Sequence, residues 1–82
     1  PVGIIVTMVE PAGPAAMAGI QPNDIIIEIN QQKIVSRAQA LDLIAETRPG
    51  TQLPVTVIRK GVKLQITVTI MELPRHSLNF SS

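Results

Sequence analysis

The feature that most constrains the fold is a pair of strand-like segments separated by two residues. Residues 53–59 are rich in β-branched side chains, and residues 62–70 alternate strictly between apolar and polar ones. Lys60-Gly61, between the segments, suits the tip of a hairpin. We therefore expect an antiparallel hairpin with one buried face. The alternation predicts that the second strand directs these side chains inward: Val62, Leu64, Ile66, Val68 and Ile70.

Two strands and a short helix are expected before this hairpin. Residues 3–9 form an apolar, β-branched run, and turn-forming residues follow it. Pro14 suits the first position of a short helix that Gly19 would end. Residues 25–30 then alternate as a second strand, after Asn23 and Asp24 in a turn.

A longer helix is expected over residues 37–47. Ser36 and Gln39 have the spacing of a capping box, in which each side chain satisfies a backbone group at the start of a helix. Pro49 and Gly50 end the pattern. The order of elements predicts one small, strongly bent α+β domain.

Composition excludes several classes of function. The chain has 82 residues, which is enough for one domain, and its net charge is +1 with a single aromatic residue. Nucleic-acid binding needs a basic face and usually stacking rings, so we expect no nucleic-acid partner. With no cysteine and one histidine, the chain is poor in metal ligands, and we expect neither a metal nor another cofactor.

No catalytic group is expected either. The only imidazole, His76, lies in a stretch without periodicity near the end of the sequence, and we interpret it as a solvated residue of a flexible tail. Asp24 and Glu28 are too far apart along a strand for paired-carboxylate chemistry, so we expect both at the surface. The basic cluster Arg59, Lys60 and Lys63 is assigned no function beyond keeping the hairpin solvated.

The long helix carries apolar residues on more than one face. Ala40, Leu43, Ile44 and Thr47 can form a core stripe, which leaves Ala38, Leu41 and Ala45 as a second stripe. The second stripe is either part of a wide core face or the wall of a binding groove. The sequence pattern leaves both interpretations open.

The sequence resembles a PDZ domain from residue 2 to about residue 73. The resemblance rests on a strand, the turn Glu10-Pro11-Ala12-Gly13-Pro14, the short helix Ala15-Ala16-Met17-Ala18-Gly19, a turn at Asn23-Asp24 and a strand that ends near Asn30. The run Ala45-Glu46-Thr47-Arg48-Pro49-Gly50 extends the similarity to PDZ domains of bacterial HtrA-family serine proteases, most closely the DegS type. The resemblance implies a bent sheet or partial barrel of about five strands with one short and one long helix.

PDZ domains bind a C-terminal peptide as an added strand, beside a carboxylate-binding loop of the type x-apolar-Gly-apolar. Pro1-Val2-Gly3-Ile4 imitates this loop, but its spacing to the short helix matches the following strand. We therefore expect a PDZ domain over residues 1–73 whose carboxylate loop and its strand lie upstream, with a flexible tail over residues 74–82. The matching groove-wall positions on the long helix are Ala38, Leu41, Asp42 and Ala45.

The resemblance also implies a function. It indicates a non-catalytic regulatory module of a periplasmic serine endopeptidase, which recognises C-termini of misfolded outer-membrane proteins and controls the protease domain of the same chain. The parent protein would be a homotrimer, with anchoring to the inner membrane as one possible arrangement. The alternative is a scaffold or oligomerisation module in another periplasmic or membrane-associated protein.

Overall fold

The structure is a computed structural model, and it describes residues 3–71. The expected tail over residues 74–82, with His76, lies outside the described residues. No helix in the described part is long and apolar enough to cross a membrane.

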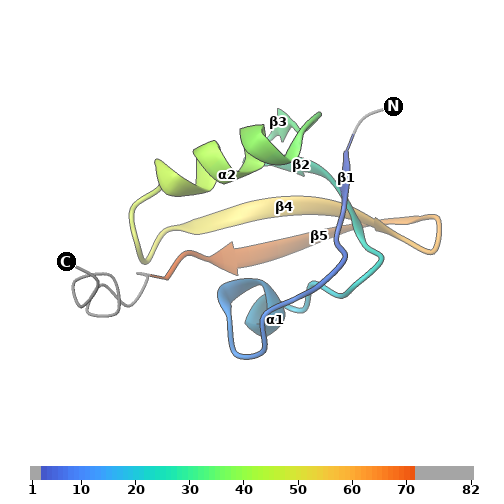
Figure 1. Ribbon diagram of the computed structural model, residues 1–82, viewed down its shortest axis with the longest axis horizontal. Helices are drawn as coiled ribbons and strands as arrows, with labels where there is room; N and C mark the ends of the chain where they lie inside the picture. Colours follow the sequence, from blue (N-terminus) through green and yellow to red (C-terminus); the bar gives the residue numbers. More distant parts are fainter. Residues whose placement is uncertain (1–2, 72–82) are drawn as a thin grey trace.

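The described chain forms one antiparallel sheet with two helices (Figure 1). The strands are β1 (Ile4–Ile5), β2 (Ile25–Ile29), β3 (Gln32–Lys33), β4 (Gln52–Arg59) and β5 (Val62–Thr69). The helices are α1 (Pro14–Ala18) and α2 (Arg37–Ala45). The order across the sheet is β1-β2-β4-β5, with β3 paired to β2. This arrangement confirms the predicted α+β class with about five strands, one short helix and one longer helix.

The hairpin of β4 and β5 has the predicted position and tip. Arg59 pairs with Val62, and Lys60 and Gly61 between them both have positive φ, as a two-residue turn of the primed type requires. The alternation also holds along most of β5, where Val68 is buried. Val62 is the exception: it is 56% exposed, because it lies beyond the reach of the core at the hairpin tip.

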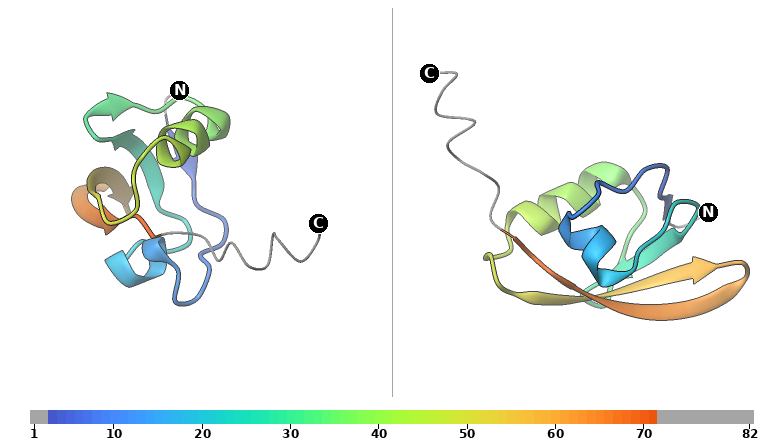
Figure 2. Two further views of the ribbon diagram at one scale, coloured as in Figure 1. Left: turned by 90° about the vertical axis from the view of Figure 1, so that its left-hand side faces the viewer. Right: turned by 90° about the horizontal axis from the view of Figure 1, so that it is seen from below.

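The core lies between the concave side of the sheet and the two helices (Figure 2). Val57 and Ile34 are fully buried at its centre, and Ala40 is the buried residue of α2. The other buried apolar residues are Ile20, Ile29, Leu53, Val55, Val68 and Ile70.

Strand β2 departs from the simple alternation expected over residues 25–30. Ile26 pairs with Val57, but Glu28 rather than Ile27 pairs with Thr56, so the strand carries a bulge. A bulge adds one residue and reverses the faces beyond it. As a result Ile26 and Ile29 both contact the core, although they are three positions apart.

Two strand predictions need correction. The segment 3–9 is regular strand only at Ile4–Ile5, because after Val6 the chain turns away from β2 towards α1. Strand β3 was not predicted at all. It is created by a tight turn at Asn30 and Gln31, which both adopt positive φ and fold Gln32–Lys33 back onto β2.

Helix α2 begins at its predicted cap and ends two residues earlier than expected, at Ala45. The Ser36 side chain accepts a hydrogen bond from the Gln39 backbone N–H at 3.1 Å. The Gln39 side chain returns to the N–H of Val35 at 2.9 Å, one residue before the position in a standard capping box, and donates to the Lys33 carbonyl oxygen at 2.8 Å. The cap therefore ties α2 to the end of β3.

We predict that Ser36→Ala destabilises the domain by about 0.5 to 2 kcal/mol, because it removes the acceptor for a backbone N–H that has no partner within the helix. Urea unfolding of both proteins measures the difference. Ser36→Asp keeps an acceptor at the cap and should unfold near the wild-type midpoint. Equal midpoints for Ser36→Ala and the wild type would contradict the role assigned to this cap.

Candidate functional site

An apolar groove with a volume of 470 Å³ separates the N-terminal segment from α2. Residues 4–10 line one wall, and Arg37, Ala40, Leu41 and Ile44 line the helical wall. The deeper lining comes from α1, the following loop and β2, through Ala15, Ile20, Ile26 and Ile29. In Figure 2 the segment of β1 runs past α2 on the side of the molecule away from the β4–β5 hairpin.

The strand wall of this groove is an open sheet edge. β1 is the terminal strand of the sheet and pairs only with β2 among the described strands. Val6 directs its backbone towards β2 as well: its N–H donates to the Asp24 carbonyl at 2.8 Å, and its carbonyl accepts from Asn23 at 2.7 Å. Since backbone groups alternate in direction along a strand, those of Ile5 point away from β2. They form the edge that an added strand can pair with.

Gly3 fixes the start of this wall. Its N–H donates to the Ile34 carbonyl at 2.7 Å, which holds the beginning of β1 beside the residues that lead into α2. Its φ is +99°, and a Cβ there would lie 2.9 Å from the carbonyl oxygen of Ile26. Only glycine accommodates both the left-handed conformation and the close approach.

The helical wall presents large apolar side chains to solvent. Leu41 is 53% exposed and Ile44 is 38% exposed, whereas the neighbouring Ala40 is buried. On the opposite wall Ile5 and Met8 are also exposed. Apolar residues exposed on both sides of one groove mark a surface that a ligand can cover.

The four predicted site residues lie at different places on α2. Leu41 lines the groove, whereas Ala38, Asp42 and Ala45 are exposed on the helix and are not among the lining residues. Sequence reasoning did not include Arg37, and it placed Ile44 in the core stripe. The 3.6-residue period could have found both, since Arg37, Leu41 and Ile44 form one row at i, i+4 and i+7.

Asp24 and Arg59 form a partly buried ion pair next to the groove wall, which corrects the expectation that Asp24 lies at the surface. Asp24 is only 1% exposed. Arg59 donates from Nε to Oδ1 at 2.9 Å and from Nη2 to Oδ2 at 2.8 Å, a two-point pair. The Arg59 Nη2 also reaches the Gly19 carbonyl at 2.8 Å, and the Gln21 N–H donates to Asp24 Oδ2 at 2.9 Å.

The Asp24–Arg59 pair has a structural role. Arg59 therefore does more than keep the hairpin solvated, which was its expected role. The carboxylate joins β4 to the loop after α1, and the backbone of Asp24 holds Val6 in the groove wall. Hydrogen bonds from Arg59 lower the pKa of Asp24 below its ordinary value of 3.8, although burial acts in the opposite direction.

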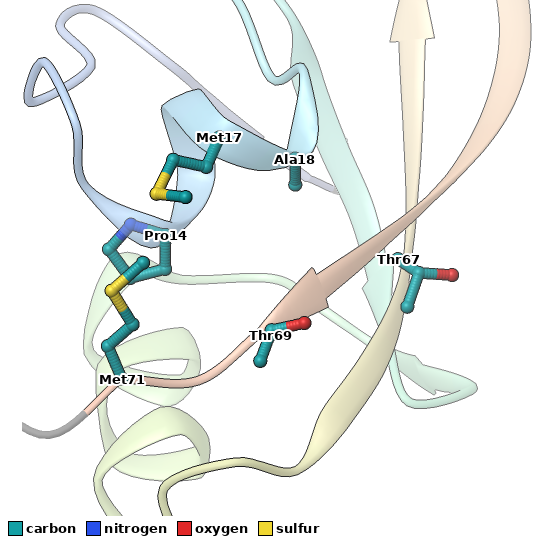
Figure 3. A pocket seen from close by; sticks show the side chains of 6 residues that line it. All are labelled: Pro14, Met17, Ala18, Thr67, Thr69 and Met71. Atoms are coloured by element: carbon teal, nitrogen blue, oxygen red, sulfur yellow. The ribbon is translucent and has the colours of Figure 1, made fainter.

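A second cavity, of 330 Å³, lies between α1 and β5 (Figure 3). Met17 and Pro14 of α1 face Met71 across it, and Thr67 and Thr69 contribute from β5. None of its lining residues is titratable. Among residues 3–71, moreover, no three of His, Cys, Asp and Glu gather where they could hold a metal ion. The larger groove beside the open edge of β1 is therefore the candidate functional site.

Comparison with known proteins gives a family for this arrangement. The family model described as a PDZ domain matches residues 2–70. The serine endoprotease DegS of Salmonella typhimurium is 49% identical over 72 residues, which cover 88% of this chain and 20% of that protein. A probable periplasmic serine endoprotease, DegP-like, from Pseudomonas savastanoi is 38% identical over 74 residues, covering 90% and 15% of the two chains. The chain thus spans about a fifth of the length of these curated relatives, or less.

Among solved structures, the HtrA-type protease AlgW with a decapeptide superposes with a TM-score of 0.83. The two are 35% identical, and the match covers 88% of this chain and 22% of AlgW. The family-model match over residues 2–70 includes both walls of the groove.

We predict that the domain loses stability in acid because of Asp24. Since the folded-state pKa lies below the ordinary value of 3.8, the contribution of the ion pair is fully present above that pH and is lost as the pH falls through the lower folded-state value. Urea midpoints between about pH 6 and pH 2 should therefore fall in the wild type.

Asp24→Asn should unfold at lower urea than the wild type at pH 7 and show a flatter decline towards acid, because the titrating partner of Arg59 is gone. Glu46→Gln removes an exposed carboxylate outside the pair and serves as the matched control. An Asp24→Asn protein with the wild-type pH profile would contradict this assignment.

Proposed function

The chain belongs to the PDZ domain family, and from this premise we propose that it is the peptide-binding regulatory module of a periplasmic, HtrA-type serine endoprotease of the DegS kind. The module has no catalysis of its own. Proteolysis belongs to another domain of the parent protein, which this module controls.

The observation that carries the proposal is the open edge of β1 facing α2 across an apolar groove. An extended peptide gains affinity by pairing its backbone with a free strand edge, and it gains specificity from side chains that enter neighbouring pockets. Here the free edge of β1 supplies backbone partners for an added strand, through which the sheet extends towards α2, and Leu41 and Ile44 supply an apolar wall. The AlgW structure with a decapeptide supports a peptide as the ligand of this fold.

We infer that the carboxylate-binding loop lies outside the described residues. Pro1-Val2-Gly3-Ile4 resembles such a loop in sequence, but the N–H of Gly3 already donates to Ile34 and is not available for a carboxylate. A strand that follows the loop and precedes Gly3 in the parent protein would pair with the free edge of β1. The peptide would then add to that strand, on the side nearer α2.

In this arrangement α2 contacts the peptide with Leu41 at its centre. Ala38, Asp42 and Ala45 form the solvent side of the contact, since all three are exposed on the helix next to the row that lines the groove. The small alanine side chains leave room for the ligand, and Leu41 covers its apolar residues.

The ligands we propose are the C-terminal peptides of misfolded outer-membrane proteins. A C-terminus that is extended and ends in apolar residues suits an apolar groove beside a strand edge. Its binding would relieve inhibition of the protease domain. The parent protein is proposed to be a periplasmic homotrimer anchored to the inner membrane, and neither nucleic acid nor a cofactor enters the mechanism.

We predict that Leu41→Ala weakens peptide binding about five- to tenfold with little loss of stability, because the side chain is half exposed until a ligand covers it. Calorimetric titration of the complete protein with a peptide ending in an apolar residue measures the affinity. The same peptide with an amidated C-terminus tests the need for the carboxylate.

Val62→Ala is the matched control, since Val62 is similarly exposed but lies at the hairpin tip away from the groove. It should bind the peptide like the wild type. Unchanged affinity for Leu41→Ala, together with a stability loss of about 2 to 5 kcal/mol, would instead assign Leu41 to the core.

A further inference from the structure

We propose that the cavity between α1 and β5 is a docking site for the segment that follows Met71 in the sequence, and that the ring of Phe80 fills it. The cavity has a volume of 330 Å³. It is separate from the peptide groove, because no residue lines both. The inference therefore goes beyond peptide binding and does not depend on it.

The walls of this cavity expose long apolar side chains to solvent. Met17 of α1 is 69% exposed and Met71 is 40% exposed, and both side chains lie beside Pro14 in Figure 3. Exposed apolar side chains that gather at a concave surface are typical of a site that a partner covers. Methionine suits such a site, because its unbranched side chain adapts to the shape of what it contacts.

The chemistry of the cavity favours an uncharged, aromatic occupant. None of its lining residues is titratable, and the hydroxyl groups of Thr67 and Thr69 are the only side-chain oxygen or nitrogen atoms in the lining. Methionine sulfur makes favourable contacts with aromatic rings. A ring that enters between Met17 and Met71 would contact two such sulfur atoms.

Residues 77–82 have the matching composition. Their sequence is Ser-Leu-Asn-Phe-Ser-Ser, which carries no charged side chain, and Phe80 is the only Phe, Tyr or Trp of the chain. Leu78 lies two positions before Phe80, the spacing that puts two side chains on one face of an extended segment. Both apolar side chains can therefore be covered at the same time.

Met71 connects the cavity to this segment. It lines the cavity and is also the last residue that the structure describes before residues 72–82. Phe80 follows nine positions later, and a segment of that length can span about 30 Å, which is enough to turn back to the cavity. Leu73 is too close to Met71 to do so, because even a tight turn takes four residues. The short tether also gives Phe80 a higher effective concentration at the cavity than a free ligand has.

Docking would fasten α1, which is held weakly otherwise. This helix has five residues, and none of them is buried. A helix of this length depends on packing for its stability. One side of α1 lines the cavity through Met17 and Ala18, and Ala15 lines the peptide groove. A ring held between α1 and β5 would therefore also steady this part of the groove.

Methyl NMR of the 82-residue chain tests the contact, because the chain has three methionines and a single Phe, Tyr or Trp residue. A ring in the cavity should shift the methyl signals of Met17 and Met71 upfield. It should also give nuclear Overhauser effects between these methyl groups and the ring protons of Phe80. Met8 is exposed in the wall of the peptide groove and serves as the internal control, whose signal should stay at the position of a solvated methionine.

Phe80→Leu should abolish the upfield shifts while keeping an apolar side chain, and His76→Ala should retain them, which identifies the ring responsible. Thr67→Arg places a charged side chain in the cavity and should also abolish them. Gln65→Arg is the matched control, because Gln65 is exposed on the same strand but does not line the cavity. It should keep the wild-type shifts.

Equal Met17 and Met71 signals in the wild type and Phe80→Leu would overturn the inference. So would upfield shifts that disappear on dilution, because these would come from Phe80 of a second copy of the chain.

Discussion

The ion pair between Asp24 and Arg59 is the interaction on which the groove depends. Its carboxylate accepts three hydrogen bonds, and its arginine also reaches the carbonyl at the end of α1. Through its own carbonyl Asp24 also holds Val6, so the same residue positions both the loop after α1 and the strand wall of the groove. Because a buried charge without its partner is costly, the loop and β4 must stay together for the chain to remain folded.

Local rules predicted most of this fold. The β4–β5 hairpin, the cap at Ser36 and the stop at Gly19 follow from residues close together in sequence, and the structure has all three. The bulge in β2 and the short strand β3 could not be predicted in this way. The bulge is fixed by the pairing of β2 with β4. Strand β3 requires positive φ at Asn30 and Gln31, and this conformation becomes favourable only when β3 pairs with β2.

The site was less predictable than the fold, for a related reason. Helical periodicity defines rows of residues on α2, but it does not say which row faces the sheet, which the groove and which the solvent. Leu41, which lines the groove, was predicted because it belongs to an apolar stripe, while Arg37, which also lines it, was not considered because charged residues are normally solvated. The burial of Asp24 was missed because its partner lies 35 residues away in the chain.

The two outer strands of the sheet differ in a way that favours one of them for binding. The side chains of β5 that face away from the core are Lys63, Gln65, Thr67 and Thr69, and such polar and charged residues discourage further strand pairing. The edge segment of β1 instead exposes Ile5 and Met8, opposite the exposed Leu41 and Ile44 of α2. An apolar edge left open beside an apolar helix invites aggregation unless another strand covers it. The edge of β5 therefore discourages further strand pairing, whereas the edge of β1 can accept an added strand.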